Sequence, residues 1–342
     1  MKVLVIKRDK IGDMLLTTPL LALLKSGLPG VETHLLANDY NAWVVAGDPH
    51  VDRLWTYRRV RNAGRVSLAA AWLWLWQSLA LRRERYDWVI VANGDESPRA
   101  IRRGLSLRGK RTVARCADAS AYSELTDPLP PDVAGHEIER LLGLLAPLGI
   151  SPPAHAGLPA YMLPPRCSEF ARRWLAERGL APGKYVVLGL GARRPKKQPS
   201  TTQVLAWSAH LKQRWNLDTV FMWTPGESGD SLYPGDDEVA QPVVDAVSDG
   251  RAPYIHPFRG PISEALGLIW SARTSVFPDS GLMHFAAASP GGVLGLFAET
   301  KVSPAPAQWA PRGRNADYLE ADRSVSELPE TPVYERLAKL LA

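Results

Sequence analysis

Short apolar segments rich in β-branched residues alternate with helical patterns along the whole chain, and this alternation limits the possible folds more than any other feature. Such an order favours parallel sheets with helices on both faces. In the first half, strands are expected at 3–6, 32–37, 53–57, 88–92 and 111–114, followed by a helix at 136–148. In the second half, strands are expected at 185–190, 219–223, 275–278 and 293–297, among helices at 170–178, 204–215, 264–271, 283–289 and 332–341. The sequence therefore predicts an α/β protein with two doubly wound domains.

A proline-rich segment separates the two halves. Residues 151–165 contain five prolines, and prolines at this density cannot continue a helix or a central strand. We expect an N-terminal domain at 1–150, a linker at 151–165, a C-terminal domain at 166–325 and a C-terminal helix within 326–342, preceded by irregular sequence. Two doubly wound domains of similar size imply a cleft between them, which suits a reaction of two substrates.

Charge and cysteine content restrict the class of protein only loosely. The net charge of +6 favours an anionic partner such as nucleic acid, a phospholipid surface or a phosphorylated substrate, or reflects only a solvated basic surface. Cys116 and Cys167 offer neither a disulfide framework nor metal-ligand spacing. Lys7 and Arg8 interrupt the first apolar run, which is therefore neither a signal peptide nor a membrane span. We expect a cytoplasmic protein.

The first expected strand leads into the pair Gly12-Asp13 and then into a helical pattern that runs from Met14 to Leu24. Asp13 is thereby expected at the carboxyl edge of a parallel sheet, where open α/β folds bind their ligands. It is either a catalytic carboxylate or a helix cap that accepts free backbone N–H groups.

Two loops of the second half suit a phosphate. Residues 189–202 combine small residues with basic ones before a helix start, although a basic surface loop would look the same. Residues 279–284 follow a strand, and the free amides of residues 280–283 would form a pyrophosphate cradle. His284 there either donates to a phosphate or packs in the core. Neither loop has the spacing of a Walker A or a G-x-G-x-x-G motif.

Acidic turns lie between these loops. Glu227 and Glu238 are candidates to bind a ribose diol, and ordinary turn chemistry explains them equally well. The chain contains no Asp-x-Asp pair, so it offers no obvious Mg²⁺ or Mn²⁺ site for a sugar diphosphate.

Two further segments point to anionic or interfacial partners. Residues 99–115 hold seven basic residues and no acid. Residues 66–81 are sixteen uncharged residues that include Trp72, Trp74 and Trp76, too few to span a bilayer comfortably. This segment is either a helix buried against the first domain or a tryptophan-rich helix at a membrane interface, with at least one indole exposed.

Together these segments resemble the lipopolysaccharide heptosyltransferases of glycosyltransferase family 9, over nearly the whole chain. The resemblance rests on residues 7–19, 136–140, 191–199 and 279–284, the last followed by Gly295-Leu-Phe and the most specific. It implies a GT-B fold, in which two Rossmann-like domains face each other across a cleft, with the acceptor on the first domain and the nucleotide-sugar on the second. It also implies inverting, metal-independent transfer of heptose from ADP-L-glycero-D-manno-heptose to the lipopolysaccharide inner core, without a cofactor.

The resemblance also implies roles for individual residues. Asp13 matches the catalytic base, and Lys196 matches a catalytic lysine that contacts the donor and stabilises charge. The residues that it implies for nucleotide-sugar binding are Gly12, Gly191, Ala192, Arg193, Glu238, Asp279, Ser280, Gly281, Leu282, Met283 and His284. Arg99, Arg102 and Arg103 are expected to meet the anionic acceptor. This chain departs from the family pattern at Gln198, where a tryptophan is usual. It also departs in the stretch 228–237, which is longer than usual and affects the assignment of Glu238 as the ribose-binding carboxylate.

With a donor site in place, Asp13 is expected to act as a base as well as a cap. The expected partners are an ADP-heptose donor, an anionic lipopolysaccharide core acceptor and the cytoplasmic face of the inner membrane, bound peripherally, with no nucleic acid. The alternatives are a GT-B enzyme with another nucleotide-sugar or acceptor, and a non-catalytic nucleotide- or anion-binding protein. A nicotinamide-dependent oxidoreductase is disfavoured because the glycine fingerprint is missing.

Overall fold

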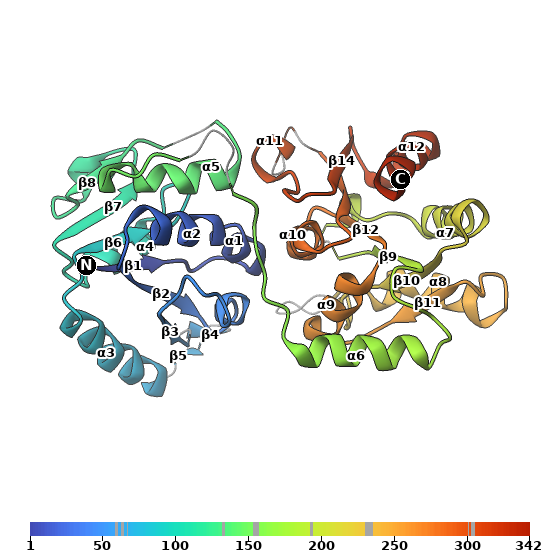
Figure 1. The fold of residues 1–342 in the computed structure, drawn as a ribbon, viewed down its shortest axis with the longest axis horizontal. Helices are drawn as coiled ribbons and strands as arrows, with labels where there is room; N and C mark the ends of the chain where they lie inside the picture. Colours follow the sequence, from blue (N-terminus) through green and yellow to red (C-terminus); the bar gives the residue numbers. More distant parts are fainter. Residues whose placement is uncertain are drawn as a thin grey trace. The chain divides into compact units, whose positions relative to one another are not determined.

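The structure is a computed structural model that describes residues 1–58, 61–62, 65–66, 68–131, 134–152, 157–191, 194–229, 235–299, 301 and 305–342 (Figure 1). It divides into two compact units, Met1–Met162 and Leu163–Ala342. The division falls inside the segment 151–165 that is expected to link two domains.

The first unit is built on a parallel sheet with the strand order β3-β2-β1-β6-β7-β8. Its strands are β1 (Lys2–Ile6), β2 (Glu32–Asn38), β3 (Arg53–Tyr57), β6 (Trp88–Val91), β7 (Arg111–Arg115) and β8 (Asp127–Leu129). The side chains of β1 from Val3 to Ile6 are fully buried, as expected for a central strand covered on both faces. A short antiparallel pair, β4 (Arg61–Asn62) and β5 (Arg65–Val66), lies outside this sheet.

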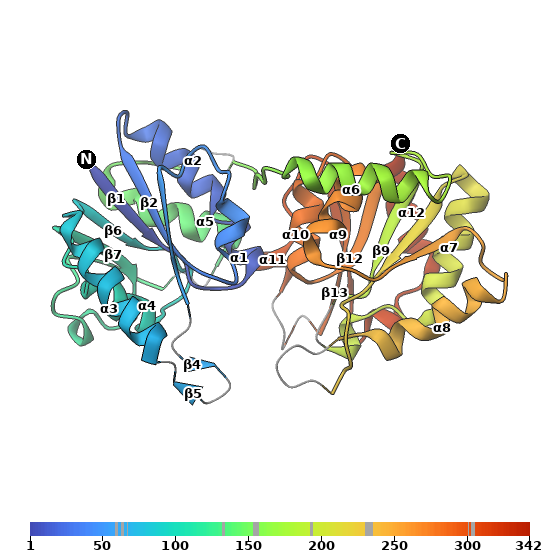
Figure 2. The same ribbon diagram turned by 90° about the horizontal axis from the view of Figure 1, so that it is seen from below.

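Helices cover both faces of the first sheet (Figures 1 and 2). One face carries α2 (Thr18–Gly27) and α5 (Glu137–Leu142), which pack against each other, and α1 (Ile11–Leu15) precedes α2. The other face carries α3 (Leu68–Arg83), which contacts β3, and α4 (Pro98–Leu105), which contacts β6 and β7. The 3₁₀ turns are η1 (Ala42–Val45), η2 (Ala119–Ala121) and η3 (Gly143–Leu148).

The second unit repeats the plan with the strand order β11-β10-β9-β12-β13-β14, again parallel. Its strands are β9 (Tyr185–Gly189), β10 (Asp218–Met222), β11 (Ile255–Phe258), β12 (Thr274–Pro278), β13 (Val293–Ala298) and β14 (Ala316–Ala321). Its helices are α6 (Pro165–Ala176), α7 (Thr201–Trp215), α8 (Asp237–Ser248), α9 (Ile262–Ser271), α10 (Gly281–Ala288), α11 (Pro306–Trp309) and α12 (Glu330–Leu341), with turns η4 (Pro195–Lys197) and η5 (Val325–Glu327). A core that includes Trp207, Phe221 and Leu337 joins α7 and α12 to the sheet.

The predicted alternation of strands and helices is confirmed, with bounds shifted by a few residues. The single helical pattern after Gly12 is in fact two helices, because the turn at Leu16-Thr17 ends α1 and Pro19 stands in the first turn of α2. The stretch before the last helix was expected to be irregular, which is wrong, since β14 lies there and pairs with β13. The short strand β8 and the strand β11 were not expected.

Gly267 fixes how closely α6 and α9 approach each other. A Cβ atom at this position would lie 2.1 Å from the carbonyl oxygen of Cys167, a backbone atom that cannot move aside alone. Gly267→Ala is expected to lower the free energy of unfolding by about 1–3 kcal/mol, because overpacking outweighs the better helix propensity of alanine. The measurement is urea denaturation. Gly229→Ala, where an added Cβ meets no atom of the described residues within 4 Å, is the control, and equal stability of both variants would contradict this account.

Candidate functional site

Asp13 lies where β1 ends and α1 begins, at the carboxyl edge of the first sheet. Its Oδ2 accepts a hydrogen bond from the Lys10 backbone N–H at 3.0 Å, so the carboxylate does cap the helix. The side chain is half-buried, and this burial raises the pKa of Asp13 above its ordinary value, while the nearby Lys7 cation acts in the opposite direction. A carboxylate with a raised pKa at a sheet edge has the properties of a general base.

Lys7 follows β1 directly and is almost fully buried, with 1% of its surface exposed. Its Nζ lies 3.1 Å from Asp9 Oδ2 and 3.9 Å from Glu137 Oε1. Asp9 Oδ2 also accepts from Asn93 Nδ2 at 2.7 Å. A buried ammonium must be compensated in this way, and Lys7 therefore ties the loop after β1 to the loop after β6 and to α5.

Glu137 comes from the predicted segment 136–140. It is buried, and its Oε2 lies 3.7 Å from Arg140 Nη1 in the next turn of α5. Arg140 donates to the Gly94 carbonyl at 3.0 Å and to the Asp95 carboxylate. A Cβ at Gly94 would lie 2.4 Å from Glu137 Oε2, so a larger residue there would displace this carboxylate. The sequence analysis singled out this segment only as a point of resemblance and missed its role as the counter-charge of Lys7.

The three arginines expected to meet an acceptor differ in their surroundings. Arg99 and Arg102 on α4 are exposed. Arg103 is buried, stacks on the Trp74 ring at 4.5 Å and donates to Ser78 Oγ at 2.7 Å, and burial lowers its pKa to about 10. Arg103 therefore anchors α3, and only Arg99 and Arg102 present exposed guanidinium groups.

In the second unit, the predicted segment 279–284 starts α10 at the carboxyl edge of β12. Asp279 Oδ2 lies 2.5 Å from Lys197 Nζ, and both side chains are largely buried. Ser280 occupies the N-cap position without capping, since its Oγ is buried and has no hydrogen-bond partner in the described part of the chain. The first amides of α10 are consequently left without a side-chain partner at a helix end that favours anions.

The side chains of the first turn of α10 are less accessible than its amides. Met283 is fully buried in the core, whereas Gly281 and Leu282 are half-buried. His284 is 4% exposed, and burial lowers its pKa to about 4, so the imidazole is neutral near pH 7. Within the described residues its Nδ1 has no hydrogen-bond partner. His284 can therefore offer a neutral N–H to an anion but no positive charge.

The basic loop before α7 places its two lysines differently. Lys196 is exposed and pairs with Glu299 at 2.6 Å, whereas Lys197 is buried beside Asp279. Sequence reasoning favoured Lys196 and missed Lys197, for which only its position next to Lys196 gave a signal. Gln198 donates to Asp236 Oδ1 at 2.6 Å. Gly191 lies close to Ser280, whose Oγ would be 3.7 Å from an added Cβ, while Ala192 and Arg193 lie outside the described residues.

The carboxylates after β10 also differ from one another. Glu227 is exposed, and Glu238 is exposed with its Oε2 accepting from Ser228 Oγ at 2.8 Å. Asp237 instead accepts from Arg259 Nε and Nη2 at 2.9 and 2.8 Å and from Trp223 Nε1 at 2.7 Å. These hydrogen bonds, led by those of Arg259, hold the pKa of Asp237 well below its ordinary range. Asp237 therefore fixes the start of α8, and Glu238 is left facing solvent.

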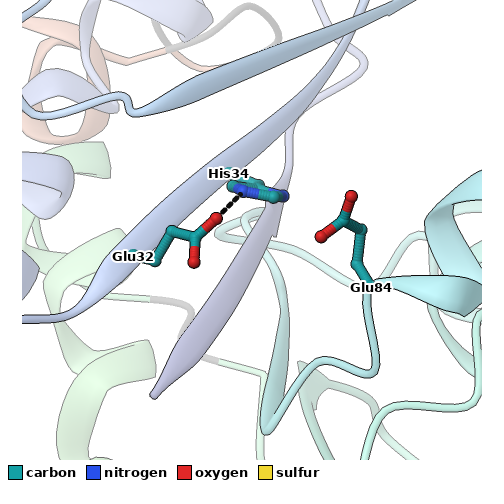
Figure 3. Close-up of side chains that lie close together, drawn as sticks. All are labelled: Glu32, His34 and Glu84. Atoms are coloured by element: carbon teal, nitrogen blue, oxygen red, sulfur yellow. Dashed lines mark hydrogen bonds and ion pairs between the residues drawn. The ribbon is translucent and has the colours of Figure 1, made fainter.

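Three side chains of the first unit lie close enough together to bind a metal ion, but their charges are compensated by neighbouring cations. Ligand atoms of Glu32, His34 and Glu84 lie within 4.8 Å of one another (Figure 3). Lys2 Nζ lies 3.4 Å from Glu32 and 2.7 Å from Glu84, and Arg53 Nη1 lies 2.6 Å from Glu84. The hydrogen bond from His34 and then the Lys2 ammonium lower the pKa of Glu32, and Lys2 and Arg53 lower the pKa of Glu84. The cluster is thus an ion-pair network that joins β1, β2 and β3.

Glycosyltransferases are among the solved structures that share this fold. Escherichia coli ADP-heptose LPS heptosyltransferase II matches with a TM-score of 0.75 at 19% identity, over 100% of this chain and 98% of that one. E. coli heptosyltransferase WaaC with ADP matches at 0.76 and 18%, over 99% and 100% of the two chains. A family 9 glycosyltransferase from Veillonella parvula matches at 0.81 and 17%, over 99% and 97%. The two parallel sheets with their helices thus form the predicted GT-B fold.

The sequence comparison identifies the family. The model of glycosyltransferase family 9 (heptosyltransferase) matches residues 72–327, and the chain belongs to this family. Lipopolysaccharide heptosyltransferase 3 of E. coli is 24% identical over 299 residues, which cover 84% of this chain and 81% of that protein. The predicted resemblance and the prediction of a glycosyltransferase are therefore confirmed.

Asp237 and Glu238 form a matched pair for a test of the turn before α8. Asp237→Asn is expected to lower the free energy of unfolding by about 1–3 kcal/mol at neutral pH, because charge-assisted bonds from Arg259 are lost. A carboxyl whose pKa is depressed on folding stabilises the protein above its unfolded pKa, so the difference from wild type should shrink as the pH falls below about 4. Urea denaturation at several pH values measures this effect.

Glu238→Gln is the control for that measurement. Its side chain is exposed and holds one exposed hydrogen bond, so the change should stay within about 0.5 kcal/mol. Equal losses in both variants, or a loss in Asp237→Asn that does not depend on pH, would contradict the assignment.

Proposed function

We propose that this family 9 enzyme transfers heptose from ADP-L-glycero-D-manno-heptose to the lipopolysaccharide inner core, with inversion at the anomeric carbon and without a metal ion. In this proposal the N-terminal domain binds the acceptor and the C-terminal domain binds the nucleotide-sugar. The observation that carries it is Asp13, a half-buried carboxylate with a raised pKa at the carboxyl edge of the first sheet. The E. coli relative at 24% identity is lipopolysaccharide heptosyltransferase 3, which supports the choice of sugar and acceptor.

Asp13 acts as the general base. A sugar hydroxyl is a weak nucleophile at neutral pH, and a positioned carboxylate must take its proton as the new bond forms. The acceptor oxygen attacks the anomeric carbon from the face opposite the diphosphate, so one C–O bond forms while the bond to ADP breaks. Only the ionised form of Asp13 can accept the proton. Burial strengthens it as a base, and Lys7 keeps its pKa from rising further.

The second unit stabilises the departing diphosphate. The free amides at the start of α10 offer hydrogen bonds and a positive helix end. Lys197 and Lys196 are proposed as further donors to the diphosphate, although each is now paired with a carboxylate, Lys197 with Asp279 at this loop and Lys196 with Glu299 after β13. Fixed donors of this kind meet the developing charge without reorganisation, which is the basis for proposing catalysis without a metal. Glu238, exposed at the start of α8, is proposed to bind the ribose.

The acceptor side is proposed to use positive charge as well. Arg99 and Arg102 of α4 are exposed in the N-terminal unit and suit the phosphates and acidic sugars of a lipopolysaccharide core. We further propose that the enzyme works in the cytoplasm on the inner membrane, bound peripherally. Among the described residues, no helix is long and apolar enough to cross a membrane.

Asp13→Asn tests the catalytic base. Release of ADP from ADP-heptose, with a water-soluble truncated core as acceptor, should fall by about 10²–10⁴-fold in kcat, while donor affinity is unchanged. Including a chelator in the assay tests metal independence at the same time. Glu124→Gln, an exposed acid of the same unit, is the control. Undiminished transfer by Asp13→Asn would refute the role of Asp13 as the base. If the wild-type enzyme used a different nucleotide-sugar and not ADP-heptose, the proposed donor would be refuted.

Lys7→Met tests the electrostatic link to the base. Removing this cation should raise the pKa of Asp13, so the base stays protonated to higher pH and the acidic limb of the kcat/KM profile moves upward in pH. The variant also leaves Asp9 and Glu137 without their shared cation and should lose stability. Lys7→Arg keeps the charge and separates the two effects, because it should leave the acidic limb in place. An unshifted limb in a folded Lys7→Met enzyme would contradict the link.

A further inference from the structure

The sequence left two alternatives open for α3, and complete burial against its domain is excluded, because the helix exposes large apolar side chains. Trp72 and Leu73 are each 60% exposed, Trp76 52%, Leu75 45%, Trp74 38% and Leu79 36%. Soluble proteins rarely leave so many large apolar side chains together on the surface, and such a patch marks an interaction site.

Three of the exposed apolar side chains form an ordered ridge, whereas Leu73, Trp74 and Leu75 lie on other sides of the helix. Trp72, Trp76, Leu79 and Arg83 follow one another at steps of four, three and four residues, which places them along one line of the helix. The two indoles stack edge to face with their centroids 5.9 Å apart. On the opposite side of the helix Leu81 is fully buried and Ser78 nearly so. The apolar ridge therefore faces away from the sheet.

The helix is held firmly in this orientation. Arg103 of α4 stacks on Trp74 and donates to Ser78 Oγ at 2.7 Å, and Gln77 Nε2 donates to the Thr56 carbonyl at 2.8 Å. Leu81 belongs to the core that includes Leu4 and Tyr86. The outward ridge is thus a property of a docked helix on the outside of its unit (Figure 2).

The charge beside the ridge is positive. Arg82 and Arg83 end α3 and are exposed, and the helix contains no acidic residue. The next acid, Glu84, is paired with Lys2 and Arg53. Tryptophan and leucine beside arginine suit the boundary between acyl chains and anionic headgroups. A second protein with an apolar groove would not call for this basic end.

We infer that α3 is a membrane-docking helix, which lies in the plane of an anionic bilayer surface and inserts Trp72, Trp76 and Leu79 into it. Arg82 and Arg83 contact the anionic headgroups. Sixteen residues lying flat suffice for this mode, which requires no span. The inference rests on the proposed function in one respect, namely that the lipopolysaccharide acceptor is anchored in a membrane. It identifies α3 as the surface through which the enzyme would bind that membrane.

The test is co-sedimentation of the full chain with vesicles. Wild type should bind vesicles of phosphatidylethanolamine and phosphatidylglycerol and bind pure phosphatidylcholine weakly. The triple variant Trp72→Gln, Trp76→Gln, Leu79→Gln should bind the anionic vesicles at least about tenfold more weakly. Arg82→Gln with Arg83→Gln should also weaken binding by about tenfold or more and reduce its sensitivity to salt.

The control is a double variant of exposed apolar residues elsewhere, Leu158→Gln with Tyr318→Gln, which should bind vesicles like wild type. Urea denaturation verifies that each variant folds. Vesicle binding by the triple variant equal to wild type would overturn the inference. A second result would also overturn it: wild type binds no vesicles and sediments as a dimer, and the triple variant sediments as a monomer. In that case a second copy of the chain would cover the ridge.

Transfer to a water-soluble truncated acceptor separates this inference from the proposed function. The α3 variants should keep wild-type transfer to that acceptor. Loss of vesicle binding with intact transfer supports the docking helix. Vesicle binding by wild type without any heptose transfer would overturn the proposed function and leave the docking helix standing.

Discussion

The N-terminal unit depends on the burial of one positive charge. Lys7 directly follows the central strand β1 and points its ammonium into the protein, where it contacts Asp9 and approaches Glu137. Leaving the buried Lys7 ammonium or the buried Glu137 carboxylate without a partner costs several kcal/mol, about 3–5 for a broken buried pair. The loop after β1, the loop after β6 and the start of α5 must therefore come together for the unit to fold. The same lysine sets the charge environment of Asp13, so folding and the proposed chemistry share one group.

Much of the fold could be predicted from local sequence signals. The apolar β-rich runs that became β1, β6 and β9 are unambiguous, because a strand buried on both faces needs a continuous apolar run. The strands that were missed lie farther from the sheet centre. In β11 the sequence Ile-His-Pro-Phe contains a proline, and β14 is half-exposed with two acids, so neither has the expected pattern and only pairing with a neighbour makes it a strand.

The site was predictable to a lesser degree. The position of residues 13 and 279–284 after a strand was predictable because it is a local property, and their roles stay predictions. Side-chain partners are not local. Nothing in the sequence distinguishes Lys196 from Lys197, yet only the second is buried beside Asp279. Likewise, Asp237 and Glu238 are adjacent acids that the sequence does not distinguish. Asp237 has a structural role because it accepts hydrogen bonds from Arg259 and Trp223, which are distant in sequence.

Arg103 links two surfaces that sequence reasoning treated separately. Its guanidinium stacks on Trp74 of α3, while its own helix α4 carries the exposed Arg99 and Arg102. A rigid coupling of this kind fixes the height of α4 above whatever plane α3 rests on. An enzyme anchored through α3 would sample acceptors in a thin slab of constant depth, so the distance of a sugar from its lipid anchor would itself become a criterion of substrate choice.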